Sequence, residues 1–158
     1  MAVPRSRTVE DSRVVMTEIV MPEDTNHHGN IFGGRVLALI DKASAIAGIR
    51  HCHLPVVTAA IDRVDFLAGA EEGSILHLEA ALNAAFTTSM EVGVTVFAES
   101  PLSGERRMTC RAFVTLVAVD RGRRPAPVPI LEARDEHERR RADDAAERRR
   151  RRKVPPSP

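Results

Sequence analysis

The helical pattern over residues 33–49 constrains the fold of this chain more than any other part of the sequence. Apolar residues recur there at helical spacing through about four turns: Val36, Leu37, Leu39, Ile40, Ala43, Ile46, Ala47 and Ile49. They cover most of the helix circumference, and a helix that is apolar nearly all round is one enclosed by other structure. Small residues such as Ser44 and Gly48 would let neighbouring backbone approach closely. We therefore expect this helix to be the central element of the fold.

Five strand-like segments flank this helix. A β-branched run precedes it at residues 13–20, and four further segments follow at 56–66, 74–82, 89–99 and 107–119. The stretches "AGAEEG" and "SPLSG" indicate turns between them, and consecutive strands joined by short turns run antiparallel. The sequence thus predicts an α+β fold in which an antiparallel sheet wraps around one long helix.

Length and composition favour one globular domain. The chain has 158 residues, and we place the boundary of the folded part near Pro129, which gives a domain at 1–131 and a tail at 132–158. Neither a signal peptide nor an apolar run of about 18 residues is recognisable, so we expect a cytoplasmic protein that does not bind membranes. Cys52 and Cys110 are too few for a disulfide framework and are interpreted as reduced thiols.

The tail is strongly charged. Residues 132–158 hold 10 Lys/Arg and 7 Asp/Glu, with acids spaced to meet bases three or four residues later. We interpret this segment as a solvated helix. Its basic run, Arg148 to Lys153, could contact nucleic acid or anionic lipid, but the rest of the chain is slightly acidic and lacks Trp and Tyr for base stacking, so we expect no nucleic-acid partner.

A polar, glycine-containing stretch lies directly before the central helix. The pattern "MPEDTNHHGNIFGG", followed at a fixed distance by "LID", resembles the hotdog-fold acyl-CoA thioesterases, both the bacterial single-domain enzymes and the cytosolic acyl-CoA hydrolases of animals. Similarity continues through "RHC" at 50–52, "DRVDFL" at 62–67 and "LVAVD" at 116–120, and covers about residues 14–131. The D-T-N, G-N and F-G-G elements and the helical acid all occur in order and at the family's spacing.

The resemblance implies a hydrolase that releases a carboxylic acid and free coenzyme A. Thioester hydrolysis needs an attacking water, a base for its proton and donors for the oxyanion that forms. Gly33 and Gly34 open the helix, where free N–H groups can hold a carbonyl oxygen. Asp41 lies seven residues beyond Gly34, on nearly the same side of the helix and about 10 Å along its axis.

Asp41 and Asn30 each have a structural alternative. Asp41 could be an exposed helical acid paired with an arginine, but its apolar neighbours and the family match favour a base or a nucleophile, and the sequence does not choose between those two mechanisms. Asn30 could serve only as a turn residue or helix N-cap. The resemblance implies instead that the asparagine of "GN" is catalytic.

By resemblance, the pantetheine arm of coenzyme A would run near Arg63, Phe66, Thr88 and Ser89. Arg111 is a candidate phosphate ligand, because planar guanidinium donors match phosphate oxygens. Ordinary strand charges and a core aromatic residue are the alternative interpretation. The turn before "SM" reads "AAFTTSM" and lacks the Lys or Arg that relatives often carry there, so phosphate contacts would come from hydroxyl groups or another subunit.

Histidines at 27, 28, 51 and 53 raise the question of a metal site. Adjacent residues on a strand or turn point apart, and the spacing matches no ligand set, so we expect no metal and no cofactor, coenzyme A being part of the substrate. A hotdog hydratase or dehydratase is the alternative enzyme, but it would need a helical histidine, and none lies between 35 and 50. A non-catalytic acyl-CoA-binding regulator is the third possibility.

The predicted architecture also bears on assembly. A single sheet around one helix leaves strand edges unpaired, and pairing with a second copy would cover them. The resemblance implies homodimers with shared active sites, three of which form a hexamer. On this hypothesis, Asn30 of one subunit works with Asp41 of its neighbour.

Overall fold

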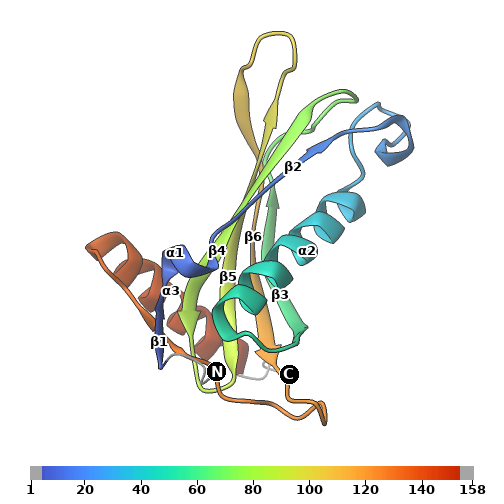
Figure 1. The fold of residues 1–158 in the computed structure, drawn as a ribbon. Helices are drawn as coiled ribbons and strands as arrows, with labels where there is room; N and C mark the ends of the chain where they lie inside the picture. The colour runs from blue at the N-terminus through green and yellow to red at the C-terminus, as the bar shows by residue number, and fades with distance from the viewer. Residues whose placement is uncertain (1–4, 154–158) are drawn as a thin grey trace, which may run out of the picture.

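The computed structural model describes residues 5–153 and has the expected α+β architecture (Figure 1). Five strands form one antiparallel sheet in the order β2-β4-β5-β6-β3. Their bounds are Val14–Ile19 for β2, Val56–Phe66 for β3, Ile75–Ala85 for β4, Ser89–Glu99 for β5 and Arg106–Ala118 for β6. The strands therefore lie where the sequence pattern predicts them, within a few residues.

Helix α2 (Gly33–Cys52) packs along the concave face of this sheet. Leu39, Ile40 and Ala43 are completely or almost completely buried, as the apolar pattern predicts. Close packing explains the small residues, because a Cβ atom at Gly48 would lie 2.6 Å from the Leu116 side chain of β6. The helix ends at His53, which adopts a left-handed conformation (φ 53°). Helix and sheet together form the core.

The pairing of β3 was not apparent from the sequence. The short connection after β3 suggests that β3 and β4 are partners, but β3 pairs with β6 and forms one edge of the sheet, while β2 forms the other. The connection instead crosses from one edge of the sheet to β4. The β3 ladder carries register shifts near Thr58 and Asp62, and Arg63 has a positive φ of 41°.

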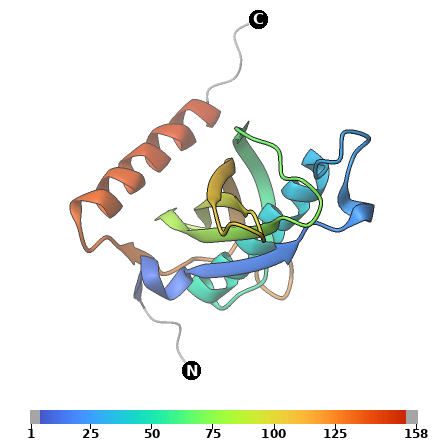
Figure 2. The same cartoon turned by 90° about the horizontal axis from the view of Figure 1, so that it is seen from above.

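The C-terminal segment corrects one expectation. Residues 136–153 form a helix, α3 (Glu136–Lys153), as predicted, but it is not a free solvated tail. Ala145 is fully buried, and the Arg148 guanidinium stacks on the Phe113 ring at 3.7 Å. Phe113 belongs to the sheet face opposite α2, because residues alternate between faces along a strand and its neighbour Val114 is part of the core. Figure 2 shows α3 beside this outer face.

Short elements at both ends of the chain complete the described structure. Strand β1 (Ser6–Thr8) pairs in parallel with β7 (Ile130–Glu132), the strand that leads into α3. Helix α1 (Val9–Ser12) follows β1, and a 3₁₀ turn, η1 (Pro22–Asp24), precedes the polar stretch. The terminal stretch "VPPSP" lies outside the described residues. Within residues 5–153, no helix combines the length and apolar character needed to cross a membrane.

Candidate active site

The polar stretch before α2 is a loop that is ordered by Asn26. The Oδ1 atom of Asn26 accepts hydrogen bonds from the backbone N–H groups of His28 (2.9 Å) and Asn30 (3.3 Å). Its backbone N–H also donates to the carbonyl oxygen of Asn30 (2.8 Å). Gly29 turns the loop with a φ of 79°, a conformation that favours glycine. Within residues 5–153, the Nδ2 group of Asn26 has no acceptor and is available to a ligand.

The first turn of α2 presents free backbone donors. Phe32 is the N-cap residue and supplies no side-chain cap, and the N–H groups of Arg35 and Val36 both donate to its carbonyl oxygen. The N–H groups of Gly33 and Gly34 have no acceptor among the described residues. Nothing lies within 4 Å of the position that a Cβ atom would take at Gly34. The helix therefore begins at Gly33, as the sequence predicts, and an open N-terminus of this kind suits a negatively charged oxygen.

A cleft of about 370 Å³ lies beside this helix terminus. The loop contributes Asn26 and Asn30, and α2 contributes Gly33 and Val36. The remainder of the lining is apolar or weakly polar: Ile31, Phe66, Leu67, Ala68, Gly69, Ala70, Thr109 and Cys110. No Asp, Glu or His lines the cleft, so the described part of one chain supplies it with donors and apolar surface but with no base.

Asp41 lies about two helical turns along α2 from Gly34, outside the lining of the cleft, and faces β3. Its Oδ1 atom accepts a hydrogen bond of 2.6 Å from the Thr58 hydroxyl group. Thr58 is exposed on the edge strand, and Asp41 is half-buried. No arginine pairs with Asp41 among the described residues, so the alternative of an acid held in an ion pair finds no support in this structure. Oδ2 remains free to accept a proton.

The proposed coenzyme A ligands fall into two groups. Phe66 lies over the helix terminus, with its ring 3.3 Å from the Cβ position at Gly33, and it lines the cleft. Arg63 and Arg111 both contact Asp65, at 3.1 Å and 3.7 Å respectively. These three residues therefore occur near one end of β3.

Thr88 and Ser89 lie elsewhere. Ser89 pairs with Val117 of β6, and Phe66 pairs with Cys110 of the same strand. Val117 and Cys110 are seven residues apart. Seven strand residues span about 23 Å. One chain therefore does not bring Thr88 and Ser89 next to Arg63 and Phe66. Strands β3 and β5 both run antiparallel to β6, so the start of β5 lies level with the start of β3, whereas Arg63 and Phe66 lie towards the end of β3.

The histidines considered as metal ligands occupy separate places. His27 and His28 are exposed and stack on each other, with ring centroids 3.9 Å apart. His51 is buried, its Nε2 atom lies 2.8 Å from the carbonyl oxygen of Pro129, and burial lowers its pKa below the usual value. His53 caps α2. Among residues 5–153, no three His, Cys, Asp or Glu side chains are grouped as metal ligands would be.

Two residues with suitable geometry were missed in the sequence. Asn26 belongs to the D-T-N element, but the sequence analysis selected Asn30 as the catalytic asparagine. The Asn30 side chain lies against Gly69, with its Oδ1 atom 2.7 Å from the position that a Cβ atom would take there. Thr58 gave no local signal, because a threonine on a strand is ordinary. Only the fold shows that it faces the acid of α2.

Comparison with known proteins identifies relatives over nearly the whole chain. Residues 28–105 match the family model described as the thioesterase superfamily. The chain is 39% identical, over 87% of its length and 80% of the relative, to an uncharacterized acyl-CoA thioester hydrolase of Bacillus subtilis. It is also 38% identical to acyl-coenzyme A thioesterase 11 of Mus musculus, of which it spans only 20%.

Solved structures of acyl-CoA thioesterases have the same fold. A hexameric acyl-CoA thioesterase in its apo form superposes with a TM-score of 0.91 at 45% identity, covering 95% of this chain and 96% of that one. An acyl-CoA hydrolase of Staphylococcus aureus, solved with butyryl coenzyme A, coenzyme A and coenzyme A disulfide, gives a TM-score of 0.87 at 35% identity, covering 94% and 90% of the two chains.

Variants of the S. aureus hydrolase provide a further comparison. Separate structures carry alanine in place of one asparagine, one aspartate and one threonine. In that chain, 15 residues separate the asparagine from the aspartate, and 17 separate the aspartate from the threonine. Asn26, Asp41 and Thr58 have the same two separations in this chain.

Proposed function

The chain belongs to the acyl-CoA thioester hydrolases of the thioesterase superfamily, which have the hotdog fold, and we propose that its active site combines the cleft of one copy with Asp41 of a second. The reaction is hydrolysis of an acyl-CoA to a carboxylic acid and coenzyme A. The observation that carries the proposal is the pair of free N–H groups at Gly33 and Gly34, which open beside a largely apolar cleft.

These two amides are suited to stabilise the oxyanion of thioester hydrolysis. When water attacks the carbonyl carbon, negative charge develops on the carbonyl oxygen, and preorganised donors stabilise that charge. The partial positive charge of the N-terminus of a 20-residue helix adds to the effect. The amide group of Asn26 is a third donor at the same cleft. The tetrahedral intermediate then collapses by breaking the C–S bond, and the leaving thiolate takes up a proton.

Asp41 is the group that we propose activates the nucleophile. The Thr58 hydroxyl group holds Oδ1, which fixes the orientation of the carboxylate and leaves Oδ2 for a water molecule. In the base route, Oδ2 accepts the proton of the attacking water. In the nucleophile route, Oδ2 attacks the carbonyl carbon itself and water hydrolyses the resulting anhydride. After a single turnover in ¹⁸O-labelled water, label in the Asp41 carboxylate would identify the nucleophile route with water attacking the Asp41 side of the anhydride, because the base route places label only in the carboxylic acid product.

The separation of Asp41 from the cleft supports a site shared between copies. Gly33 lines the cleft and Asp41 does not, although both belong to α2. Edge strand β3, beside Asp41, exposes the apolar side chains of Val57 and Ile61. A second copy paired along this edge would cover these side chains and bring its own cleft to Asp41. Hexameric relatives agree with an oligomer.

Coenzyme A would lie across such an interface. We propose that Arg63, Phe66 and Arg111 of one chain contact it near the cleft, and that Thr88 and Ser89 contribute from another chain, since about 23 Å of strand separates the two groups within one chain. Arg111 is half exposed and contacts Asp65 only at 3.7 Å, so its guanidinium is available to a phosphate.

Replacing each loop asparagine by alanine should distinguish their roles. We expect Asn26→Ala to lower kcat at least tenfold, because it removes both a cleft donor and the acceptor that orders the loop. Asn30→Ala should have a smaller effect on kcat, because its side chain is directed at Gly69. Steady-state thiol release measures both variants. A larger loss in Asn30→Ala would restore Asn30 as the catalytic amide.

Thiol release from acyl-CoA substrates of increasing chain length tests the proposed function as a whole. The purified protein should release free coenzyme A and the carboxylic acid in equal amounts. A hotdog hydratase, given a 2-enoyl-CoA, would instead lower the absorbance of the thioester-conjugated double bond without releasing thiol. Binding of acyl-CoA with neither reaction would indicate a regulator.

A further inference from the structure

A second cavity lies on the outer face of the sheet, away from the cleft. It has a volume of about 330 Å³ and is enclosed between α3 and strands β4, β5 and β6. Arginines from three parts of the chain line it: Arg13 before β2, Arg111 on β6, and Arg141 and Arg148 on α3. Only two carboxylates, Glu79 and Asp144, belong to the lining. Arg13 pairs with Glu10, Arg111 contacts Asp65 and Arg148 pairs with Glu91, so Arg141 is the arginine of this lining that has no ion-pair partner among the described residues.

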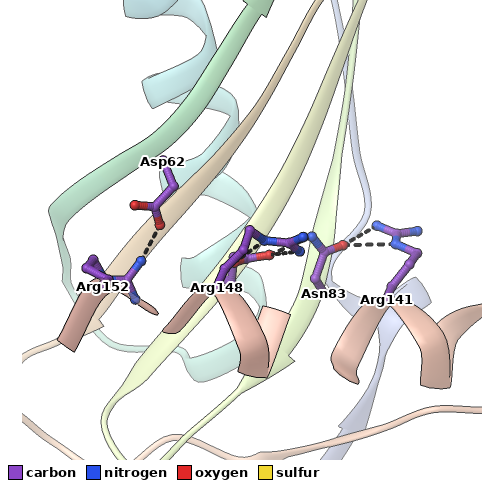
Figure 3. Close-up of polar contacts among 6 residues, drawn as sticks. Asp62, Asn83, Arg141, Arg148 and Arg152 are labelled. Carbon is purple, nitrogen blue, oxygen red and sulfur yellow. Dashed lines mark hydrogen bonds and ion pairs between the residues drawn. The ribbon is translucent and has the colours of Figure 1, made fainter. Parts of the chain in front are cut away.

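Arg148 is fully engaged by the protein. Its Nη2 and Nε atoms donate to the two carboxylate oxygens of Glu91, at 2.7 Å and 3.0 Å, and its guanidinium stacks on Phe113. Glu91 is only 2% exposed. Figure 3 shows Arg148 and Arg141 reaching from α3 to the sheet. Arg148 thus fixes the position of α3 and has little capacity for a ligand.

Arg141 is in a different situation. Its Nε and Nη2 atoms both donate to Oδ1 of Asn83, at 2.9 Å and 2.5 Å, and Asn83 is neutral and 3% exposed (Figure 3). No carboxylate lies within ion-pair distance of Arg141 in residues 5–153. Its Nη1 group makes no hydrogen bond to the described chain. A half-buried guanidinium therefore faces the cavity without a counter-ion.

Neighbouring cations make this position less favourable for a positive charge. Burial lowers the pKa of Arg141 and the charge of Arg13 lowers it further, while the carboxylates of Glu138 and Glu91 offset part of this effect. A half-buried charge that is repelled by its neighbours is stabilised when an anion enters between them. Guanidinium groups bind phosphate oxygens through two parallel N–H donors. Arg141 has no carboxylate partner among the described residues and can offer such a pair of donors through Nη1 and Nη2.

We propose that this cavity, the α3 groove, binds a phosphate-bearing anion, with Arg141 as its main ligand and Arg13 as a second ligand. Asn83 is the buried polar side chain that holds the Arg141 guanidinium in place. Gly93 makes room for this arrangement, because a Cβ atom there would lie 2.8 Å from Nδ2 of Asn83. The volume suits a diphosphate or a compact phosphate ester.

Titration of the full-length protein with inorganic pyrophosphate tests the α3 groove. We expect saturable binding by calorimetry and a rise in Tm, because the anion binds only the folded state. Arg141→Gln should weaken binding at least tenfold, and Arg13→Gln should weaken it by a smaller factor. Arg139→Gln is the matched control: Arg139 lies on the same helix, pairs with Glu136 and is outside the groove lining.

The test has clear contrary outcomes. Absence of pyrophosphate binding to the wild-type protein, or equal weakening by Arg139→Gln and Arg141→Gln, would overturn the proposal. If Arg141→Gln fails to fold, the comparison of Arg13→Gln with Arg139→Gln decides. These measurements need no turnover, so they stand apart from the proposed hydrolase activity.

Kinetics identifies the source of the phosphate. If the groove holds the phosphates of coenzyme A, pyrophosphate should compete with acyl-CoA, and Arg141→Gln should raise KM for acyl-CoA but not for an acyl-pantetheine. If a free phosphate compound binds there, pyrophosphate should not compete, and KM should be unaffected by the substitution. Either pattern supports a phosphate site on the outer face of the sheet.

Discussion

Replacing Asp41 by asparagine should lower kcat/KM for acyl-CoA hydrolysis by a factor of about 100 or more, with folding intact. The substitution keeps the shape of the side chain and an oxygen that can accept the Thr58 hydrogen bond. It removes the negative charge that makes Asp41 a base or a nucleophile. A hundredfold loss corresponds to about 2.7 kcal/mol of transition-state stabilisation. Thiol release at several acyl-CoA concentrations gives kcat and KM separately.

Asp143→Asn is the matched control, because it makes the same chemical change on an exposed position of another helix. We expect its turnover and Tm to equal those of the wild-type protein. Wild-type turnover in Asp41→Asn would remove Asp41 from the mechanism. A large fall in its Tm would show instead that the carboxylate has mainly a structural role.

Replacing Arg148 by methionine should destabilise the protein by about 3–5 kcal/mol. The substitution leaves the Glu91 carboxylate, which is 2% exposed, without its cationic partner. Methionine retains much of the side-chain volume over Phe113, so the loss of stability would come mainly from the uncompensated charge of Glu91. Chemical denaturation followed by circular dichroism measures the change in the free energy of unfolding.

A double-mutant cycle separates the charge from the packing. Adding Glu91→Gln to Arg148→Met removes the buried charge, and we expect it to recover more than half of the lost stability. Arg150→Met is the control, since its pairing with Glu147 is exposed and should be worth less than about 1 kcal/mol. Equal effects of Arg148→Met and Arg150→Met would mean that α3 is not anchored on the sheet through Glu91.

Local pattern was sufficient to predict the helix and strands of the core. The apolar period of α2 and the alternation of β5 are properties of consecutive residues, and the structure reproduces both. Local pattern could not predict the partner of β3, because strand pairing depends on residues far apart in the sequence. The short connection from β3 to β4 therefore gave a misleading indication of which strands are neighbours.

The docking of α3 was missed because its composition is typical of a solvated helix. The relevant signal lay elsewhere in the chain, at Asn83 and Glu91, which are polar residues within strands whose neighbours are almost all apolar. A charged residue in the middle of such a strand requires a partner when it is buried. In the candidate site, helix geometry was enough to select the glycine pair and Asp41 as candidates, but the Thr58 contact required the fold.

The shared active site is the central claim, and refolding two inactive variants together tests it most directly. Asn26→Ala and Asp41→Asn are each expected to be nearly inactive as homo-oligomers. In a mixed dimer, one site contains both substitutions, and the other combines intact Asn26 from one copy with intact Asp41 from the other. Random assembly of equal amounts should therefore restore about a quarter of wild-type thiol release. No recovery above the two parents, with subunit exchange verified by native mass spectrometry, would contradict the account and place Asn26 and Asp41 in the same chain's site.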